Sequence, residues 1–218
     1  MSAGTYYRGP GEGRAEADAA RLFPAIPGWH VIFAHRNRDS GLVEVLTETG
    51  IQTYNEEEFA DEVERVQAAA GKPVLLLMCY AGHVADADAF AFGFRNRRDT
   101  PVVAVDGVVW ITGDGVLVRQ LAAGVMPTDP DQGDPGGFLL YPAAMGQLPI
   151  RYDELHRALS AGLPDRPPIS ALPRIPVDTP AHFMLPGARH GSAQARSSAS
   201  SGVDVGEGPS SAAATTVS

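Results

Sequence analysis

An uninterrupted apolar run at residues 74–78, Val-Leu-Leu-Leu-Met, is the feature that most restricts how this chain can fold. The run is too short for a buried helix, and it lacks the alternation of apolar and polar residues that marks a strand with one solvated face. Such a run is typical of a strand in the middle of a parallel sheet that is covered on both faces. The sequence therefore predicts a layered protein in which residues 74–78 form a central strand.

The segments around this run extend the prediction to a whole domain. An apolar run at residues 29–34 predicts a second buried strand, and residues 42–46 and 51–54 predict a hairpin. Asn55, with Glu58 three residues later, predicts the capped start of a helix. Further along we expect a helix between residues 83 and 94, a strand at 102–105, and a hairpin of 108–111 with 116–118. This order predicts an α/β layered fold with a mainly parallel central sheet and helices on both faces.

Composition divides the chain into four parts. Its 218 residues include 24 glycines and 18 prolines, more than a folded domain of this length usually contains. We expect a flexible N-terminal segment at residues 1–21, with at most a short helix over 12–22, followed by the α/β domain at 22–125. The proline-rich residues 126–186 predict a strap that packs on the domain, and residues 187–218, poor in large apolar side chains, predict a disordered tail.

The charge balance limits the partners. The chain has 26 acidic and 17 basic residues, a formal net charge of -9, which argues against a groove that follows nucleic-acid phosphates. No apolar run approaches the roughly 18 residues that span a bilayer, and the N-terminus lacks the pattern of a secretory signal. We expect a protein without nucleic-acid or membrane partners, cytoplasmic or exported without a signal peptide. The acids of residues 56–64 predict a solvated helix surface, or else a docking face for a basic partner.

The first candidate for a functional residue is Cys79, the only cysteine of the chain. One thiol excludes an internal disulfide and a multi-cysteine zinc site, and leaves a packed apolar residue, a metal ligand or a nucleophile. Cys79 follows the run at 74–78, and His35 follows the strand predicted at 29–34. If these strands are parallel neighbours, both residues emerge at one edge of the sheet. An imidazole beside a thiol can accept its proton, and the thiolate can attack a carbonyl carbon.

Five segments carry a resemblance to a known family. They are Leu-Phe-Pro-Ala-Ile-Pro-Gly at 22–28, the strand ending at His35, Lys-Pro-Val-Leu-Leu-Leu-Met-Cys-Tyr-Ala-Gly at 72–82, Thr-Pro-Val-Val-Ala at 100–104, and Val-Trp-Ile-Thr at 109–112. The pattern, over residues 22–120, resembles the caspase-like cysteine peptidase domains near the C-termini of bacterial polymorphic toxins, which are related to the self-cleaving domains of large clostridial and vibrio toxins.

The resemblance implies a caspase-like fold and a cut in a peptide or protein substrate, of which the chain itself is one candidate. It implies that His35 is the catalytic base and Cys79 the nucleophile. We expect no cofactor, because the acidic chain shows no basic cluster that would bind the phosphorylated inositol that can activate the related toxin domains. The oxyanion would be held by the backbone N–H groups of Arg36 and Cys79, and Gly82 permits a tight turn that aims backbone N–H groups at it.

The sequence differs from the family pattern at three positions next to the proposed pair. Arg36 replaces the glycine after the histidine, Met78 replaces the serine before the cysteine, and Ala81 replaces the threonine before the glycine. These differences leave open a catalytically inactive domain of the same fold that serves as an interaction or regulatory module.

Two further residues have alternative interpretations. His83 could join His35 and Cys79 as a third metal ligand, although a turn at Gly82 would break that spacing and we expect no metal. Asp106 follows the strand predicted at 102–105, at the same sheet edge as Cys79. It is a candidate for selecting a basic substrate residue, or a turn aspartate before Gly107.

Overall fold

A computed structural model describes residues 4–82, 89–112, 115–122, 125, 128–143 and 148–172. All of them belong to one compact unit, Met1–Phe183. The disordered tail predicted at 187–218 lies outside the described residues. Within them the fold is α/β, with one large mixed sheet and four α-helices. No helix of the described part is long and apolar enough to cross a membrane.

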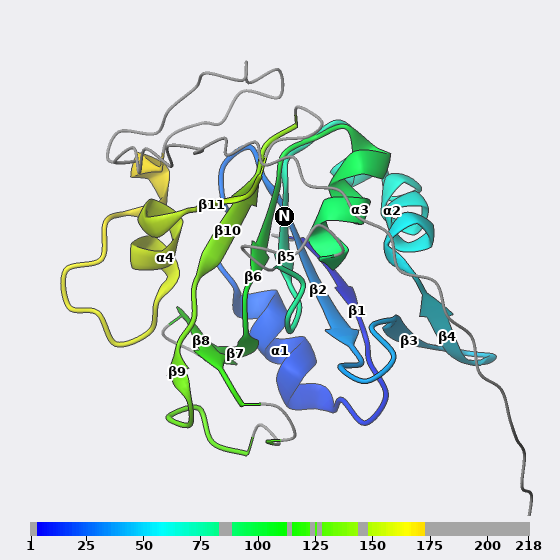
Figure 1. Cartoon of the computed structure of the whole chain (residues 1–218), viewed down its shortest axis with the longest axis horizontal. Coiled ribbons are helices and arrows are strands. Elements are labelled where there is room, and N and C mark those ends of the chain that lie inside the picture. The colour runs from blue at the N-terminus through cyan, green and yellow to red at the C-terminus, as the bar shows by residue number, and fades with distance from the viewer. Residues whose placement is uncertain are drawn as a thin grey trace, which may run out of the picture. The chain divides into compact units, whose positions relative to one another are not determined.

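Four parallel strands form the centre of an eight-stranded sheet (Figure 1). Strand β2 lies between β1 and β5, and β6 pairs with the far edge of β5, all in parallel. These strands are β1 (Gly4–Tyr7), β2 (His30–Arg36), β5 (Val74–Leu77) and β6 (Val102–Val105). Every residue of β5 is buried, which confirms that the apolar run forms a central strand.

The rest of the large sheet is antiparallel, so the sheet is mixed rather than mainly parallel. The predicted hairpin is present as β3 (Val43–Thr47) and β4 (Gly50–Tyr54), attached to the last two residues of β2. On the opposite side, β10 (Phe138–Tyr141) pairs with β6, and β11 (Ile150–Arg151) pairs with β10.

The segment predicted as a strap, residues 126–186, contributes strand β10 to the large sheet. The four residues of β10 are buried and cover the edge of β6, whose backbone N–H and C=O groups need partners. Prolines are frequent nearby, but they fall outside the strand at Pro135 and Pro142. The region also contains a helix, α4 (Asp153–Leu159).

The N-terminal residues also differ from the flexible segment predicted at 1–21. Strand β1 covers the free edge of β2, and α1 (Arg14–Leu22) follows it, close to the helix expected over 12–22. Tyr7 at the end of β1 is only 9% exposed, and its ring packs edge-on against Phe59 at 5.0 Å between centroids. The segment is ordered because β1 pairs with the open edge of β2. Amino-acid composition does not reveal that such an edge is open.

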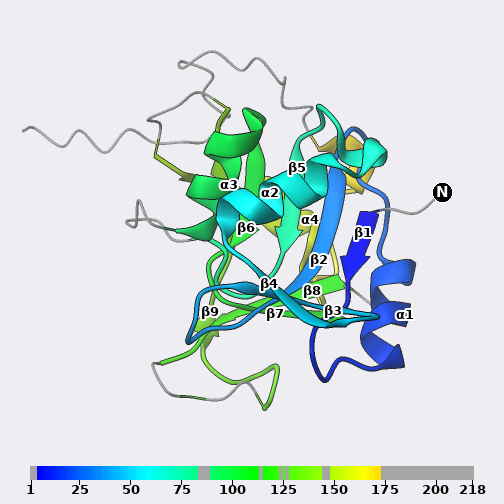
Figure 2. The ribbon, with the colours of Figure 1, turned by 90° about the vertical axis from the view of Figure 1, so that its right-hand side faces the viewer.

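Helices cover both faces of the sheet (Figure 2). Helices α2 (Glu56–Glu64) and α3 (Phe90–Arg98) pack Phe59, Phe90 and Phe94 into the core on the face that carries Ile32 and Leu76. Helices α1 and α4 lie on the opposite face, where Phe138 of β10 meets the ring of His156 from α4.

Both helix predictions can be compared with the structure. Asn55 caps α2 as predicted, since its side chain accepts hydrogen bonds from the backbone of Glu57 and Glu58. Helix α3 ends later than expected, because Phe94 and Arg98 share its buried face and the left-handed Asp99 closes it. Of the expected range, residues 83–88 lie outside the described residues.

A smaller sheet completes the described part. It contains the second predicted hairpin, β7 (Val108–Thr112) with β8 (Gly115–Gln120), and the short β9 (Asp134–Pro135) beside it. Strand β7 contacts α1, so this sheet lies next to the carboxyl end of the central strands (Figure 1). Two single 3₁₀ turns, Gln67–Ala69 and Ile169–Ala171, are the remaining described elements.

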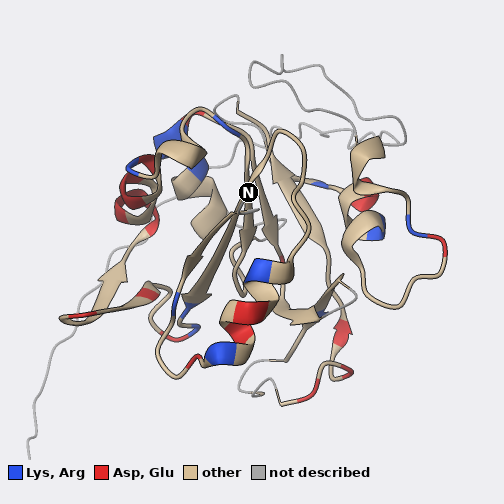
Figure 3. Ribbon diagram, turned by 180° about the vertical axis from the view of Figure 1, so that it is seen from behind, with Lys and Arg blue, Asp and Glu red and all other residues tan. Residues whose placement is uncertain are grey.

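The acids of α2 are partly neutralised by the arginines of α3 (Figure 3). Arg97 Nε lies 2.6 Å from Asp61 Oδ1, and Arg98 Nη1 lies 2.8 Å from Glu64 Oε1. The side chain of Arg98 is fully buried, and it also donates to the carbonyl of Ala69 at 2.9 Å. These arginines therefore hold the two helices together.

Candidate functional site

His35 lies near the end of β2, and Cys79 lies in the turn that directly follows the neighbouring strand β5. Strands β2 and β5 are parallel and their register pairs Phe33 with Leu77. His35 lies two residues beyond Phe33, and Cys79 lies two residues beyond Leu77. Alternation along β2 puts His35 on the same face as Phe33, and Phe33, His35, Leu77 and Cys79 all line one cavity. The topology thus meets the condition under which the two residues were expected to emerge at one edge.

Both residues line a cavity of about 370 Å³ on the α1 face of the sheet. Residues of α1, among them Ala15 and Ala19, form one wall, and the β7 segment around Trp110 forms another. Strand β1 and the turn after it also reach the cavity, through Tyr6 and Glu12. The carboxyl ends of β2 and β5, the first α-helix and the small sheet therefore enclose one space around the thiol and the imidazole.

The protein around Cys79 keeps its thiol protonated. Burial raises the pKa of Cys79 above the ordinary cysteine value, and the nearby carboxylate of Glu12 acts in the same direction. Hydrogen bonds from the backbone of Val109 and of Cys79 itself, together with the charge of Arg36, favour the thiolate but do not outweigh burial. The resting thiol of Cys79 is therefore neutral, and to act as a nucleophile it would need a base that removes its proton.

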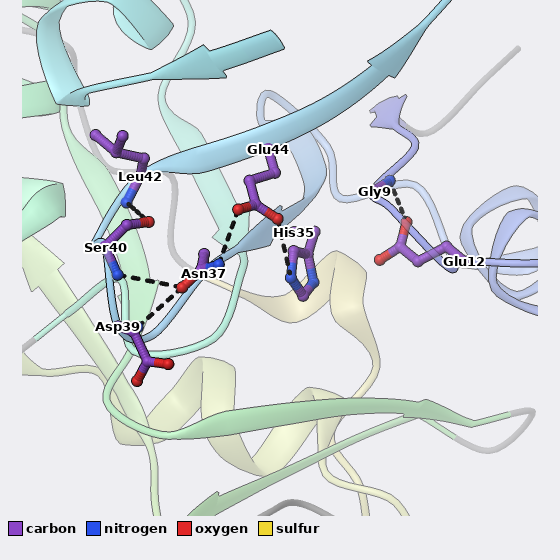
Figure 4. A network of polar contacts seen from close by, with 8 residues as sticks. All are labelled: Gly9, Glu12, His35, Asn37, Asp39, Ser40, Leu42 and Glu44. Atoms are coloured by element: carbon purple, nitrogen blue, oxygen red, sulfur yellow. Dashed lines mark hydrogen bonds and ion pairs between the residues drawn. The ribbon is translucent and has the colours of Figure 1, made fainter. Parts of the chain in front are cut away.

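A carboxylate on the adjacent strand faces His35 (Figure 4). Glu44 Oε2 lies 3.9 Å from His35 Nε2, and the two residues are paired in the register of β2 and β3. The other oxygen of Glu44 accepts a hydrogen bond from Asn37 Nδ2 at 2.8 Å. Asn37 in turn accepts backbone hydrogen bonds from Asp39 and Ser40. This network fixes the carboxylate where it can stabilise a protonated imidazole.

Gly9 packs directly against His35. A Cβ atom at Gly9 would collide with Cβ of His35 and come within 3.0 Å of its Cγ. Only glycine allows the end of β1 to pass this close, so the position of the imidazole depends on it.

Replacing Gly9 with alanine is expected to displace His35 or the end of β1 and to lower the free energy of unfolding by about 1–3 kcal/mol. Chemical denaturation measures the loss, and the NMR signals of the His35 imidazole report the displacement. Gly13→Ala is the matched control, because the nearest atom to its new Cβ is a Glu16 oxygen at 3.5 Å. Equal stability losses in both variants, with unchanged His35 signals, would contradict the assigned contact.

The side chain of Arg36 connects the two strand ends from the other face of the sheet. Its Nε donates to the carbonyl of Gly41 at 2.9 Å, and Nη1 donates to the carbonyl of Tyr80 at 3.0 Å. The guanidinium also lies over the ring of Phe90, 5.6 Å from the centroid. The arginine that replaces the expected glycine thus ties the loop after β2 to the turn after Cys79.

The backbone of Arg36 is directed differently from its side chain. The N–H of His30 donates to the carbonyl of Pro73, so backbone groups of even-numbered β2 residues face β5. By this alternation the N–H of Arg36 points toward the chain that follows β5, where Cys79 lies. Arginine in place of the glycine of the caspase-like pattern therefore still leaves the backbone N–H of residue 36 on the side of the Cys79 thiol.

Other backbone donors near Cys79 are already engaged. The N–H of Tyr80 donates to the carbonyl of Gly107 at 2.8 Å, and that of Gly82 donates to the carbonyl of Val105 at 2.9 Å. Tyr80 adopts a left-handed backbone conformation, with φ of 52°, as the chain turns away from the strand. The glycine turn expected to aim donors at an oxyanion thus anchors the loop to β6 instead.

Asp106 does not line the cavity. Its side chain is 1% exposed, it accepts a hydrogen bond from the N–H of Gly137 at 2.6 Å, and it lies 3.1 Å from Nη2 of Arg151. These contacts give it a structural position between β6 and β10. His83, the third ligand of the metal alternative, falls outside the described residues, within which no group of three potential ligands is present.

Sequence reasoning missed two carboxylates of this site. Glu44 looks like an ordinary outward residue between the apolar Val43 and Val45, and only the pairing of β2 with β3 reveals that it faces His35. Glu12 belongs to a Gly-Pro-Gly-Glu-Gly sequence that indicates a turn, but nothing local indicates that the turn folds back over the strand ends. The one available signal was glycine density, which marks close backbone approach.

Together these features define an α/β protein whose single cysteine and a histidine share one cavity at the carboxyl ends of parallel strands. Residues 10–119 match the family described as Domain of unknown function (DUF8616), and the chain belongs to this family. The match extends from the turn after β1 to β8 and includes both His35 and Cys79. No curated protein and no solved structure matches the chain.

Proposed function

We propose that this protein is a cysteine peptidase of the caspase-like type that cuts a peptide bond with Cys79 as nucleophile and His35 as base. One observation carries the proposal: adjacent parallel strands bring His35 and Cys79 to the same edge of the sheet, and both line one cavity. A general base and a nucleophile must share such a space to act on one substrate bond.

The chemistry proceeds through a covalent intermediate. His35 accepts the proton of Cys79 as the sulfur attacks the carbonyl carbon of the scissile bond, and the N–H groups of Arg36 and Cys79 donate to the oxyanion. The imidazolium, paired with Glu44, then protonates the leaving amine, and a thioester remains on Cys79. His35 next deprotonates a water molecule, which hydrolyses the thioester and restores the thiol.

The raised pKa of Cys79 decides which form of the mechanism applies. A preformed thiolate–imidazolium pair would need a lowered thiol pKa, whereas a neutral thiol needs a base that accepts its proton during attack. Glu44 supports the second form, because it lies on the Nε2 side of His35 and stabilises the charge that develops there. The substrate is a peptide or protein, and the chain itself or a fused segment is one candidate.

A second candidate function is an inactive domain of the same fold that binds a partner. The observation that favours it is the same neutral, buried thiol, together with the side chain of Arg36 between the strand ends. This candidate predicts that Cys79 reacts only as an isolated buried cysteine.

Digestion of a defined peptide library tests the proposal. The purified protein is incubated with peptides of known sequence, and new termini are mapped by mass spectrometry, with Cys79→Ala as the control. Cleavage after recurrent residues that disappears in the control supports the peptidase. Absence of cleavage, together with no labelling of Cys79 by peptidyl acyloxymethyl ketones of varied sequence, overturns it in favour of the binding domain.

A further inference from the structure

The cavity that contains Cys79 is acidic. Its described lining includes two carboxylates, Glu12 and Glu16, and no lysine or arginine. Glu16 is exposed and caps α1 by accepting a hydrogen bond from the N–H of Gly13. Glu12 is partly buried, which makes it the carboxylate with the stronger influence inside the cavity.

Two hydrogen bonds fix the carboxylate of Glu12. Its Oε2 accepts from the hydroxyl of Tyr6 at 2.9 Å and from the N–H of Gly9 at 2.6 Å. Both donors come from β1 or the residues just after it, and Gly9 also contacts His35. Glu12 is therefore held by the same segment that positions the imidazole, and it does not depend on a flexible loop.

The remaining lining suits the stem of a long side chain. Ala15, Ala19, Trp110 and Ile111 give the cavity small apolar and aromatic walls on both sides of Glu12. The indole N–H of Trp110 is buried and has no hydrogen-bond partner among the described residues. A chain of methylene groups with a cationic end can pack along such walls, and an aromatic face attracts the cation.

We propose that Glu12 selects an arginine or lysine side chain at the substrate residue whose carbonyl carbon Cys79 attacks. This inference rests on the proposed peptidase function and names its substrate class. It moves the selection of a basic residue from Asp106, which Gly137 and Arg151 already occupy, to Glu12.

Cationic substrates would also assist the reaction itself. The charge of Glu12 is one of the influences that keep the thiol of Cys79 protonated. A guanidinium or ammonium group beside Glu12 offsets that charge, so the proton leaves the thiol more easily once the correct substrate is bound. The selectivity is then expected in kcat as well as in KM.

Two matched substrates test the selection. Peptides that differ only in arginine or citrulline before the cut bond have nearly the same shape but differ in charge. We expect the wild type to prefer arginine by at least about tenfold in kcat/KM, and Glu12→Gln to lose most of this preference. The glutamine still offers an oxygen to Tyr6 and Gly9, so the turn is retained. Glu48→Gln, on the exposed turn between β3 and β4, is the control and should keep the preference.

A binding measurement separates this inference from the peptidase proposal. In the Cys79→Ala variant, N-acetylarginine amide should shift the indole N–H signal of Trp110 but not that of Trp29, and Glu12→Gln should abolish the shift. Active wild type that cleaves citrulline and arginine peptides equally overturns the role of Glu12 and leaves the peptidase intact. Cation binding at Trp110 without any cleavage or probe labelling overturns the peptidase, and with it the assigned substrate.

Discussion

In the Cys79→Ala variant, peptide cleavage is expected to fall to the uncatalysed level, a loss of roughly 10³-fold or more in kcat. Cys79 is the only cysteine in the chain, so no other thiol can replace it. The variant cannot form the thioester, and the remaining N–H donors and binding walls cannot supply a nucleophile. Initial rates on one peptide found in the library digestion, measured with matched protein concentrations, give the ratio directly.

The stability of this variant provides its control. Removal of one sulfur from a partly buried position should change the free energy of unfolding by about 1 kcal/mol or less, so the fold remains. Cys79→Ser should retain the fold equally and should also be nearly inactive, because a hydroxyl is a far poorer nucleophile at this site. Cleavage that persists in both variants would show that another residue performs the reaction.

In the His35→Ala variant, we expect kcat to fall by roughly 10²–10⁴-fold, the usual contribution of a positioned general base. The thiol of Cys79 is neutral in the resting protein, so its deprotonation during attack depends on the imidazole. Glu44→Gln should have a smaller effect, about tenfold, because it removes only the charge that stabilises the imidazolium. Rates of the three proteins with one substrate test this order.

His156→Gln is the matched control for the histidine. His156 lies on α4, on the same face of the sheet but outside the cavity lining, and burial lowers its pKa, so it is neutral near pH 7. A neutral amide at this position should leave kcat and KM unchanged. Equal rates in wild type and His35→Ala would contradict the assignment of His35 as base.

Much of the fold could be predicted because the central strands form where the local sequence itself favours a buried strand. The apolar run at 74–78 and the capped helix beginning after Asn55 depend only on neighbouring residues, and both are present. Strands β1 and β10 were missed because they are stabilised by pairing with the edges of β2 and β6. The composition of a segment does not show whether a distant strand has an unpaired edge.

The site was predictable only in part for a related reason. His35 and Cys79 could be predicted to lie close together because each comes at the end of a recognisable strand, and parallel pairing places strand ends together. Glu12 and Glu44 reach the site through a turn that folds back and through an antiparallel register, neither of which the local sequence determines. Asp106 had a suitable position at the sheet edge, but its burial against Gly137 and Arg151 depends on β10.

The most direct test of the central claim is the pH dependence with which two reagents modify Cys79 in the wild type and in His35→Ala. Iodoacetamide needs the thiolate, so burial should delay its reaction to pH values above about 8.5, the ordinary cysteine pKa, in both proteins. A peptidyl acyloxymethyl ketone engages the catalytic pair. It should label wild-type Cys79 readily near pH 7 and at least about 100-fold more slowly in His35→Ala. If both reagents follow the same alkaline profile and His35 makes no difference, Cys79 is a packed thiol and the protein is not a peptidase.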